Sequence, residues 1–409
     1  HRRCGRGRIA RPDRRRRLGR HRGLMGAALH TTAAVVFCVC AALLGYAYVG
    51  YPRLVRVLAR LRPRPTRREP IEPTVSFLIA AYNEEDAIAG KLEETLALDY
   101  PSDKLEIVVA SDHSTDRTHE IVRAYGDRGV KLFAAPDHLG KTGTANEAVP
   151  TTTGEILVFS DATGRFDRGA VRALVQNFAD PDVGAVTGRV LYDYDDGAAS
   201  AGFAAYQRFV VPQRQAESIF GTETSVSGSI HAIRRELFVA APPELSFDMV
   251  HPLHVAMAGR RSVYESEATS REESRTTAED EFRSRVRIAV RAHSFVPYLL
   301  KRLPKCRDRS YVFQVISHKL LRWWSAPLLV LALLTSAILA LQGGWWTLPF
   351  LAQLAAWVVA ASAFLATRAG LSARALGAPL MFATLQLAYL VGLARYLGGS
   401  RLAGWRPER

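Results

Sequence analysis

The stretch TVSFLIAAYNEE at residues 74–85 decides how this sequence folds, because an apolar run of strand length ends directly in acidic residues. The pattern returns at 105–112, which reads LEIVVASD, and at 155–161, which reads EILVFSD. A single acid after a strand is weak evidence, since turns favour Asp for local hydrogen bonding. Three such runs in one parallel sheet would bring their acids together, because nucleotides bind outside the carboxyl ends of strands in open α/β sheets. The pattern therefore predicts an α/β nucleotide-binding domain.

Strand and helix signals alternate along the segment that contains these runs, as is typical of βαβ units and a mostly parallel central sheet. The predicted strands lie at 75–80, 106–110, 130–134 and 156–159, and the helices between them at 85–96, 116–125 and 142–149. Downstream the pattern predicts helices at 169–178, 198–220, 234–240 and 279–293, and strands at 184–190 and 227–232.

Long apolar windows flank this domain. Spanning the hydrocarbon core of a bilayer takes roughly 20 apolar residues. The sequence therefore predicts one amino-terminal transmembrane helix at 25–51 and three carboxy-terminal ones within 323–397, namely 323–341, 345–367 and about 375–397. Residues 52–73 form a basic, proline-rich linker and residues 294–322 an interfacial helix with a linker, whose segment 295–303 suits the membrane surface. Residues 398–409 are a short tail.

The formal charge of +15 over 409 residues is concentrated at one end. Residues 1–24 hold eleven Arg and one Asp, and we interpret them as upstream sequence translated from a misplaced start. The alternative is a basic tail for nucleic acid or acidic lipid. The basic cluster at 53–68 places the domain that follows it in the cytosol, by the positive-inside tendency. A basic tail before the first transmembrane helix would then lie on the opposite side of the membrane, which argues against that alternative. We therefore expect no nucleic-acid partner.

Three side chains at the predicted crevice could act on a nucleotide. Asp112 could contact a base or ribose, because Asp116 is better placed to cap the next helix. Asp161 could hold Mg²⁺ or Mn²⁺, since a hard cation on a carboxylate neutralises a diphosphate leaving group. Lys141 lies in APDHLGKT at 135–142, a loosened P-loop pattern without its first Gly, which leaves a P-loop ATPase open as a weaker alternative.

Asp248 opens an apolar helix-like segment, where burial could raise its pKa and make it a general base. A helix N-cap is an equally good interpretation from sequence alone. His251 and His254 follow at a spacing of three, but Pro252 lies between them and no acidic partner has matched spacing, so we expect structural histidines. The four cysteines show no metal spacing and no disulfide framework.

Residues 74–292 resemble the family 2 glycosyltransferases, in particular the membrane-bound branch with the cellulose and hyaluronan synthases. The segments that carry the resemblance stand in collinear order. They are AYNEE (81–85), IVVASDHSTDRT (107–118), GKTGTANEAV (140–149), ILVFSDATGRFD (156–167), VGAVTGRV (183–190), GSIHAIRRELF (228–238), EFRSRVRIAV (281–290) and SHKLLRWW (317–324).

The resemblance implies a GT-A domain over residues 74–293, with site residues given by position. It implies that Tyr82, Glu84 and Asp112 contact the nucleoside, that Lys141 approaches the donor phosphates, and that Asp161 serves the metal and diphosphate. It further implies that Asp248 is the base for the acceptor and that Arg283 and Arg287 meet the diphosphate.

Four positions depart from the family pattern. They are His113 after Asp112, Thr163 at the second acidic position of the metal motif, Phe247 before the base and Ile288 where processive synthases carry Trp. The last argues against processive chain growth, and together they leave a weakened enzyme or a non-catalytic scaffold for envelope assembly as alternatives.

The sequence therefore predicts an inverting glycosyltransferase in the plasma (inner) membrane of a bacterium, with a cytosolic active site. It would pass sugar from a nucleotide-sugar donor, UDP-linked in our interpretation, to a lipid or saccharide acceptor. Transfer to a polyprenyl phosphate is the second hypothesis, because that anionic acceptor needs no base. A P-loop-like ATPase of an export system is the third.

Overall fold

The computed structural model describes residues 14–193, 198–273, 278–369 and 374–400. Residues 1–13 of the predicted upstream segment and residues 401–409 of the predicted tail lie outside this part. Helix α1 (Arg14–Gly45) begins within the basic segment, so its residues from Arg14 onward continue into the apolar stretch as one helix.

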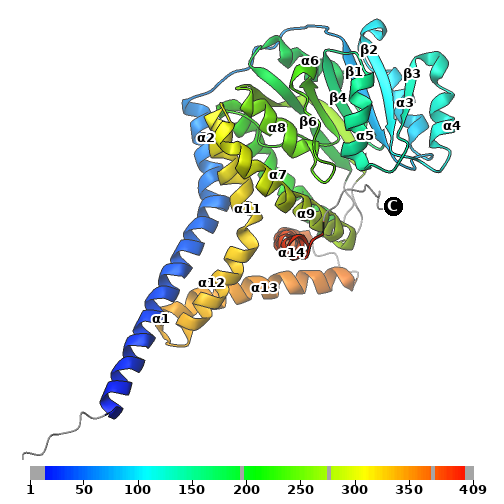
Figure 1. The fold of residues 1–409 in the computed structure, drawn as a ribbon. Helices are drawn as coiled ribbons and strands as arrows, with labels where there is room; N and C mark the ends of the chain where they lie inside the picture. Colours follow the sequence, from blue (N-terminus) through cyan, green and yellow to red (C-terminus); the bar gives the residue numbers. More distant parts are fainter. Residues whose placement is uncertain (1–13, 194–197, 274–277, 370–373, 401–409) are drawn as a thin grey trace, which may run out of the picture.

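A single eight-stranded sheet forms the centre of the domain, with the order β3-β2-β1-β4-β7-β6-β8-β5 (Figure 1). Strands β1 to β4 run parallel to one another, β7 is antiparallel to β4 and β6, β6 is parallel to β8, and β5 is antiparallel to β8. The predicted α/β class with a mostly parallel sheet is confirmed. The strands are β1 (Val75–Ala81), β2 (Leu105–Ser111), β3 (Val130–Ala134), β4 (Ile156–Asp161), β5 (Arg165–Phe166), β6 (Val183–Asp193), β7 (Ile230–Arg234) and β8 (Arg261–Glu273).

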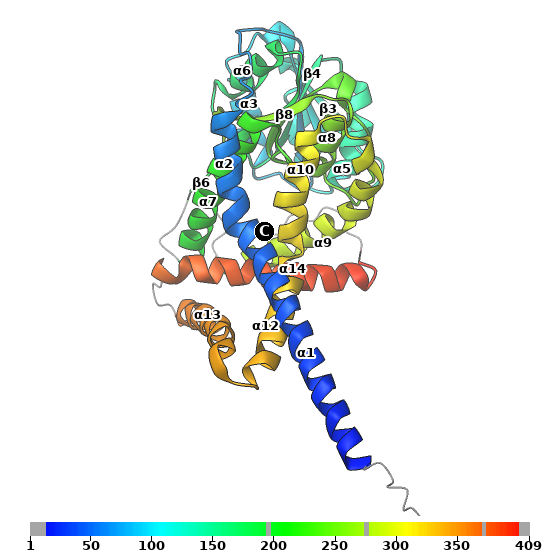
Figure 2. The same cartoon turned by 90° about the vertical axis from the view of Figure 1, so that its left-hand side faces the viewer.

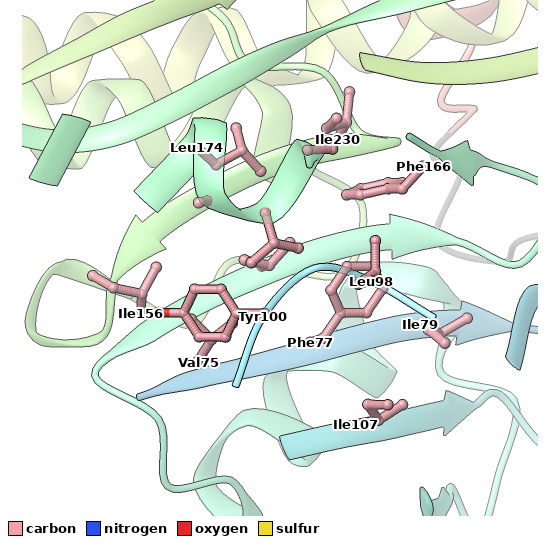
Figure 3. Close-up of a cluster of buried hydrophobic side chains, with 14 of the residues drawn as sticks. Val75, Phe77, Ile79, Leu98, Tyr100, Ile107, Ile156, Phe166, Leu174 and Ile230 are labelled. Atoms are coloured by element: carbon pink, nitrogen blue, oxygen red, sulfur yellow. The ribbon is translucent and has the colours of Figure 1, made fainter. Parts of the chain in front are cut away.

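Both faces of the sheet are buried, which explains why its strands read as continuous apolar runs. Successive side chains of a strand point to opposite faces. In β1, Phe77 and Ile79 therefore join one core cluster, together with Leu98 (Figure 3), while Leu78 joins the other, which contains Phe159. The helices of the domain are α3 (Ile88–Leu96), α4 (Thr118–Arg123), α5 (Gly140–Ala148), α6 (Ala170–Val175), α7 (Ala198–Phe220), α8 (Phe247–Met257) and α9 (Ala278–Arg302).

Four elements differ from the sequence prediction. Strand β8 was missed because its sequence, RSVYESEATSREE, is largely polar, and it pairs with β6 through two register shifts. The short strand β5 was also missed, and the helix expected at 234–240 is only the 3₁₀ turn Arg235–Leu237. Helix α9 is continuous where two helices were expected, and it buries Phe295 and Leu299 in the protein core rather than at a membrane surface.

Three helices are long and apolar enough to cross a membrane, namely Ala27–Leu61, Gly344–Arg368 and Arg374–Leu397. The first comprises most of α1, the π-helical turn Tyr46–Gly50 and α2 (Tyr51–Leu61). A bent pair, Arg309–Trp323 with Ser325–Ala340, would be a fourth candidate. It contains α10 (Arg309–Gln314), the π-helical turn Val315–Leu320, α11 (Leu321–Trp323) and α12 (Ser325–Ala340).

The bend of 56° interrupts the span that the sequence predicts from residue 323. Pro327 lies in the first turn of α12 and has no N–H to donate to the carbonyl of Trp323. This missing bond explains why the helix breaks at Trp324.

The candidate membrane-spanning helices run in two directions. Helices α1 and α12 run side by side away from the domain, whereas α13 (Thr347–Arg368) and α14 (Gly377–Leu397) lie crosswise to them (Figures 1 and 2). Helix α14 packs directly against α7 and α9. A Cβ added to Gly392 of α14 would lie 2.5 Å from the Cβ of Ala289 in α9, so only glycine permits this approach.

Candidate active site

The loops after β1 and β2 are bound to each other by hydrogen bonds. Asn83 Oδ1 accepts from the N–H of Thr115 at 2.8 Å, and the N–H of Asn83 donates to Ser114 Oγ at 3.0 Å. Asn83 and His113 have positive φ, 53° and 57°, and they are the two non-glycine residues with this conformation in the described ranges. Such backbone costs about 1–3 kcal/mol and occurs mainly where the surroundings enforce it, as at binding sites.

Tyr82 and Glu84, both predicted nucleoside contacts, lie at the end of β1. The Tyr82 ring is half-buried, with its centroid 4.7 Å from that of the His138 ring. Glu84 is buried, and its N–H donates to Thr118 Oγ1 at 2.9 Å. Asp116 Oδ1 accepts from the N–H of Thr118, the first residue of α4, at 3.0 Å, while the N-cap position itself is Arg117.

Asp112 is 1% exposed and faces the loop before α5. Its Oδ1 accepts from the N–H groups of Leu139 at 2.7 Å and Gly140 at 3.1 Å and from Thr144 Oγ1 at 2.8 Å, and its Oδ2 lies 3.0 Å from His138 Nδ1. In a P-loop, such N–H groups hold phosphate. Here a carboxylate of the chain takes them, which disfavours the ATPase alternative.

Lys141 and Asp161 come together from α5 and the end of β4. The Lys141 ammonium forms an ion pair with Asp161 Oδ1 and donates to the carbonyl of Gly228 at 3.1 Å. Their side chains remain 23% and 24% exposed, so the pair is still open to a ligand. The sequence expected these two residues on a shared diphosphate, and the structure places them in direct contact.

A small cavity of about 30 Å³ lies next to this pair, between Lys141 and the helices α8 and α9. Lys141, Asp248 and Arg291 contribute to its wall. Asp248 is the second residue of α8, and its Oδ1 is buried without a hydrogen bond from any described residue. Its backbone carbonyl accepts from the N–H of Val226 at 2.9 Å. An unbonded carboxylate oxygen at this position is what a general base requires.

The arginine at this cavity is not one of the two that the sequence predicted. Arg283 is exposed and Arg287 is half-buried, and neither lines the cavity. Arg291 lies four residues after Arg287, and its Nε is buried with no hydrogen bond within the described residues. Burial lowers the pKa of the Arg291 guanidinium, while the Asp248 carboxylate acts in the opposite direction. The helical spacing of four from Arg287 was the signal that could have identified Arg291.

The histidines near Asp248 belong to a buried aromatic cluster. His231 stacks on Phe159 at 4.8 Å, and His231 Nε2 lies 3.2 Å from His251 Nδ1. Burial lowers the pKa of His231 to about 3 and that of His251 well below its usual value. His254 Nε2 bonds the Tyr298 hydroxyl at 2.7 Å. These contacts agree with the structural interpretation of His251 and His254.

Metal ligands are scarce at the site. Thr163, at the second acidic position, is exposed, so Asp161 is the one carboxylate of the predicted motif. Across the described ranges, no group of three or more His, Cys, Asp or Glu side chains is arranged to hold a metal. A site with one carboxylate can hold Mg²⁺ or Mn²⁺ only when substrate phosphates and water supply the remaining ligands.

Part of the domain matches the model of a known family. Residues 76–240 match the model for glycosyl transferase family 2. The beta-monoglucosyldiacylglycerol synthase of Synechocystis sp. is 35% identical over 118 residues, which are 28% of this chain and 25% of that protein. The poly-beta-1,6-N-acetyl-D-glucosamine synthase of Staphylococcus aureus is 33% identical over 116 residues, 28% of each chain. The chain thus matches only about a quarter of the length of these relatives.

Similarity to a solved structure extends further along the chain. The mannosyltransferase PcManGT from Pyrobaculum calidifontis, solved with GDP-Man and Mn²⁺, aligns with a TM-score of 0.66 at 24% identity. The alignment covers 90% of this chain and 100% of that one. At this identity the likeness shows a shared GT-A fold.

Proposed function

Because residues 76–240 are a family 2 glycosyltransferase domain, we propose that the protein transfers a sugar from a nucleotide-sugar, UDP-linked, to a lipid or saccharide acceptor at a membrane. The main support is one arrangement: Lys141, which is paired with Asp161, and Asp248, which has an unbonded carboxylate oxygen, line the same cavity. We place this site on the cytosolic face of a bacterial plasma membrane, as the basic cluster before the domain indicates.

In this proposal Asp248 is the general base. The acceptor hydroxyl attacks the anomeric carbon in line and gives its proton to Asp248, and the bond from that carbon to the diphosphate oxygen breaks. The configuration at the anomeric carbon inverts. Lys141 and Arg291 line the cavity and would donate charge-assisted hydrogen bonds to the departing diphosphate. Tyr82, Glu84 and Asp112 would form the nucleoside end of the site.

Mg²⁺ or Mn²⁺ fits this site with Asp161 as its protein ligand. When bound, the ion supplies positive charge that neutralises the diphosphate. Lys141 already contacts Asp161, so the lysine helps to fix the position of that carboxylate beside the cavity.

A hydrolysis screen tests the proposal on the full chain purified in detergent. Sugar donors linked to UDP and to GDP are offered with Mg²⁺ or Mn²⁺, and the released nucleoside diphosphate is measured. We expect release from a UDP-sugar that falls with Lys141→Ala. Release from none of the donors, or ATP hydrolysis that depends on Lys141, would overturn the proposal.

A further inference from the structure

A cavity of about 360 Å³ lies between the domain and the candidate spans, and we call it the membrane-side cavity. Helices α7, α11 and α14 and the two π-helical turns form its wall, which is mainly aromatic and apolar. Its lining includes Tyr48, Tyr206, Phe209, Lys319, Arg322 and Phe382. Its volume is in the range of small-molecule sites, about 300–1,000 Å³.

A second cavity of about 480 Å³, the tail cavity, continues it among α12, α13 and α14. Ala378 and Phe382 line both cavities, so the two meet at α14. The wall of the tail cavity is almost wholly apolar, with Leu329, Trp357 and Pro379 among its members. A ligand that fills both must have an apolar chain and a polar end.

The polar end of the membrane-side cavity is cationic. Arg322 is 7% exposed; its Nη2 donates to Gln213 Oε1 at 2.5 Å, and its Nε is buried without a hydrogen bond from the described residues. Lys319 Nζ donates to Ser225 Oγ at 2.7 Å. Neither cation forms an ion pair with a carboxylate in the part of the chain that the structure describes. A buried charge without a counter-ion is costly, so an anion is the expected partner.

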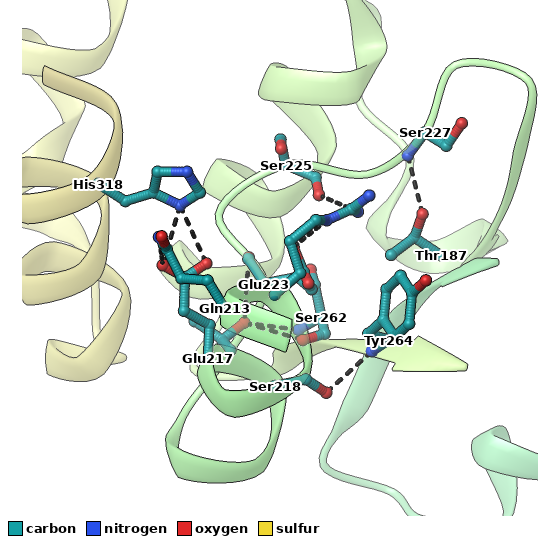
Figure 4. Close-up of polar contacts among 12 residues, drawn as sticks. Thr187, Gln213, Glu217, Ser218, Glu223, Ser225, Ser227, Ser262, Tyr264 and His318 are labelled. Atoms are coloured by element: carbon teal, nitrogen blue, oxygen red, sulfur yellow. Dashed lines mark hydrogen bonds and ion pairs between the residues drawn. The ribbon is translucent and has the colours of Figure 1, made fainter. Parts of the chain in front are cut away.

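The nearest carboxylates are engaged elsewhere (Figure 4). Glu217 accepts from the Tyr51 hydroxyl at 2.7 Å and from Gln213 at 3.0 Å, and it lies 2.9 Å from His318 Nδ1. Glu223 pairs with Arg214 at 3.2 Å. Burial raises the pKa of the Glu223 carboxyl, and the Arg214 guanidinium opposes that shift.

The cationic end is also next to the proposed base. Ser225, which accepts from Lys319, precedes Val226, whose N–H donates to the carbonyl of Asp248. Lys319 and Asp248 are close enough to interact electrostatically. An anion held by Lys319 would therefore lie one short loop away from the Asp248 carboxylate.

We propose that the two cavities bind a phospholipid whose headgroup ends in a hydroxyl. Its phosphate lies on Lys319 and Arg322, one chain follows α14 into the tail cavity, and the headgroup hydroxyl reaches Asp248. This inference rests on the proposed function and names its acceptor: the hydroxyl oxygen forms the new bond to the sugar, its proton goes to Asp248, and the nucleoside diphosphate leaves. A neutral glycerolipid would leave both cations without a direct ion pair.

Binding tests this inference without using turnover. The full chain in detergent micelles is offered phosphatidylglycerol and diacylglycerol with identical acyl chains, and retained lipid is counted by native mass spectrometry. We expect about a tenfold preference for phosphatidylglycerol, as charge-assisted hydrogen bonds imply. Lys319→Gln should abolish that preference, whereas Lys301→Gln, an exposed lysine at the end of α9, should keep it.

A second variant avoids the buried charges. Ala378→Trp fills the junction of the two cavities and should reduce retention of both lipids several-fold. Equal binding of the two lipids by the wild type, or loss of the preference in Lys301→Gln as much as in Lys319→Gln, would overturn the inference. Donor hydrolysis is measured on the same wild-type preparation: hydrolysis without lipid preference refutes the inference alone, and lipid preference without hydrolysis refutes the proposed function.

A polyprenyl phosphate serves as a third probe. It carries the phosphate but no headgroup hydroxyl, so we expect it to bind and not to be glycosylated. Sugar transfer to it that survives Asp248→Asn would overturn the inference in favour of an anionic nucleophile.

Discussion

The donor half, made by strands β3, β2, β1 and β4 with the loops at their ends, differs from the acceptor half, made by helices α8, α9 and α11, in how its polar groups are used. In the first, Asp112 Oδ1 accepts three hydrogen bonds and Asp161 is paired with Lys141, while the buried Asp112 Oδ2 has no hydrogen bond within the described part of the chain but lies 3.0 Å from His138 Nδ1. In the second, Asp248 Oδ1, Arg291 Nε and Arg322 Nε are buried without a hydrogen bond from any residue described. The donor half is thus held ready by its own contacts, whereas the acceptor half has polar atoms that a ligand can satisfy.

The largest effect should come from the acceptor half. Asp248→Asn removes the base and keeps the shape, so sugar transfer should fall by about 10²–10⁴-fold. Donor binding, measured by calorimetry with UDP, should stay within twofold, because the donor side keeps its contacts. Glu244→Gln, in the loop just before α8, is the matched control and should leave transfer unchanged. Full activity of Asp248→Asn would remove the contrast between the two halves.

The next largest effect separates the arginine found in the structure from those expected from the sequence. Arg291→Gln should lower transfer by about 10²–10³-fold, as loss of one donor to a developing oxyanion does. Arg283→Gln, at an exposed position of the same helix, should change it less than twofold. Initial rates at saturating donor measure both. A greater loss in Arg283→Gln would place the diphosphate at the start of α9.

A smaller effect concerns the metal. Chelation by EDTA should stop donor hydrolysis, and titration with Mn²⁺ should restore it. Thr163→Asp restores a second carboxylate and should lower the Mn²⁺ concentration for half-maximal rate by about tenfold, since ligand charge sets affinity. Thr163→Asn, of equal size without the charge, is the control. Identical Mn²⁺ titrations for the Asp and Asn variants would mean that the added carboxylate is not a ligand, and that Asp161 and the diphosphate already supply the charged ligands of the ion.

The smallest effect is on stability and concerns Lys91, which supports the donor half. Lys91 is 2% exposed and its ammonium donates to the carbonyl of Gly164, in the loop after Asp161. Burial lowers its pKa from 10.5 to about 7. Below pH 7 both states are protonated and the fold bears the cost of a buried cation; between pH 7 and 10.5 the unfolded chain binds more protons, so stability rises with pH.

Lys91→Met removes this dependence. The unfolding midpoint of the variant relative to the wild type should therefore be higher at about pH 6.5 than at about pH 9. Differential scanning fluorimetry in detergent measures the two midpoints. Lys104→Met removes a lysine that is 38% exposed and should give the same difference at both pH values. A Lys91→Met difference that does not change with pH would mean that the lysine is already neutral or well solvated.

The donor half was predictable because its signals are local. The runs of β1, β2 and β4 are apolar on both faces and lead into acids, so Asp112 and Asp161 were predicted at the strand ends from order alone, and Lys141 was predicted from its loosened P-loop pattern and the family resemblance. The acceptor half depends on tertiary pairing. Strand β8 has a largely polar sequence and pairs with β6 through register shifts. Arg291 and Arg287 lie one turn apart on α9, and only the tertiary position of the cavity selects Arg291.

The inward orientation of Asp112 was also beyond the sequence. Its three donors come from the loop before α5 and from Thr144, about thirty residues away along the chain. The membrane-side cavity arises from helices that are far apart in sequence, so no local motif could indicate it. The roles of these residues in catalysis remain predictions that the variants above test.

The hydrogen bond from Tyr51 to Glu217 has a practical consequence for how this protein can be isolated. Tyr51 and Val55 of α2 are fully buried against Ala216 of α7, so the first helix supplies part of the fold and is more than a tether. A soluble fragment cut in the proline-rich linker would uncover that apolar patch and leave Glu217 short of a donor. Cell-free synthesis of the full chain directly into lipid discs would keep α2 in place, so that the donor half and the acceptor half can be studied in one preparation.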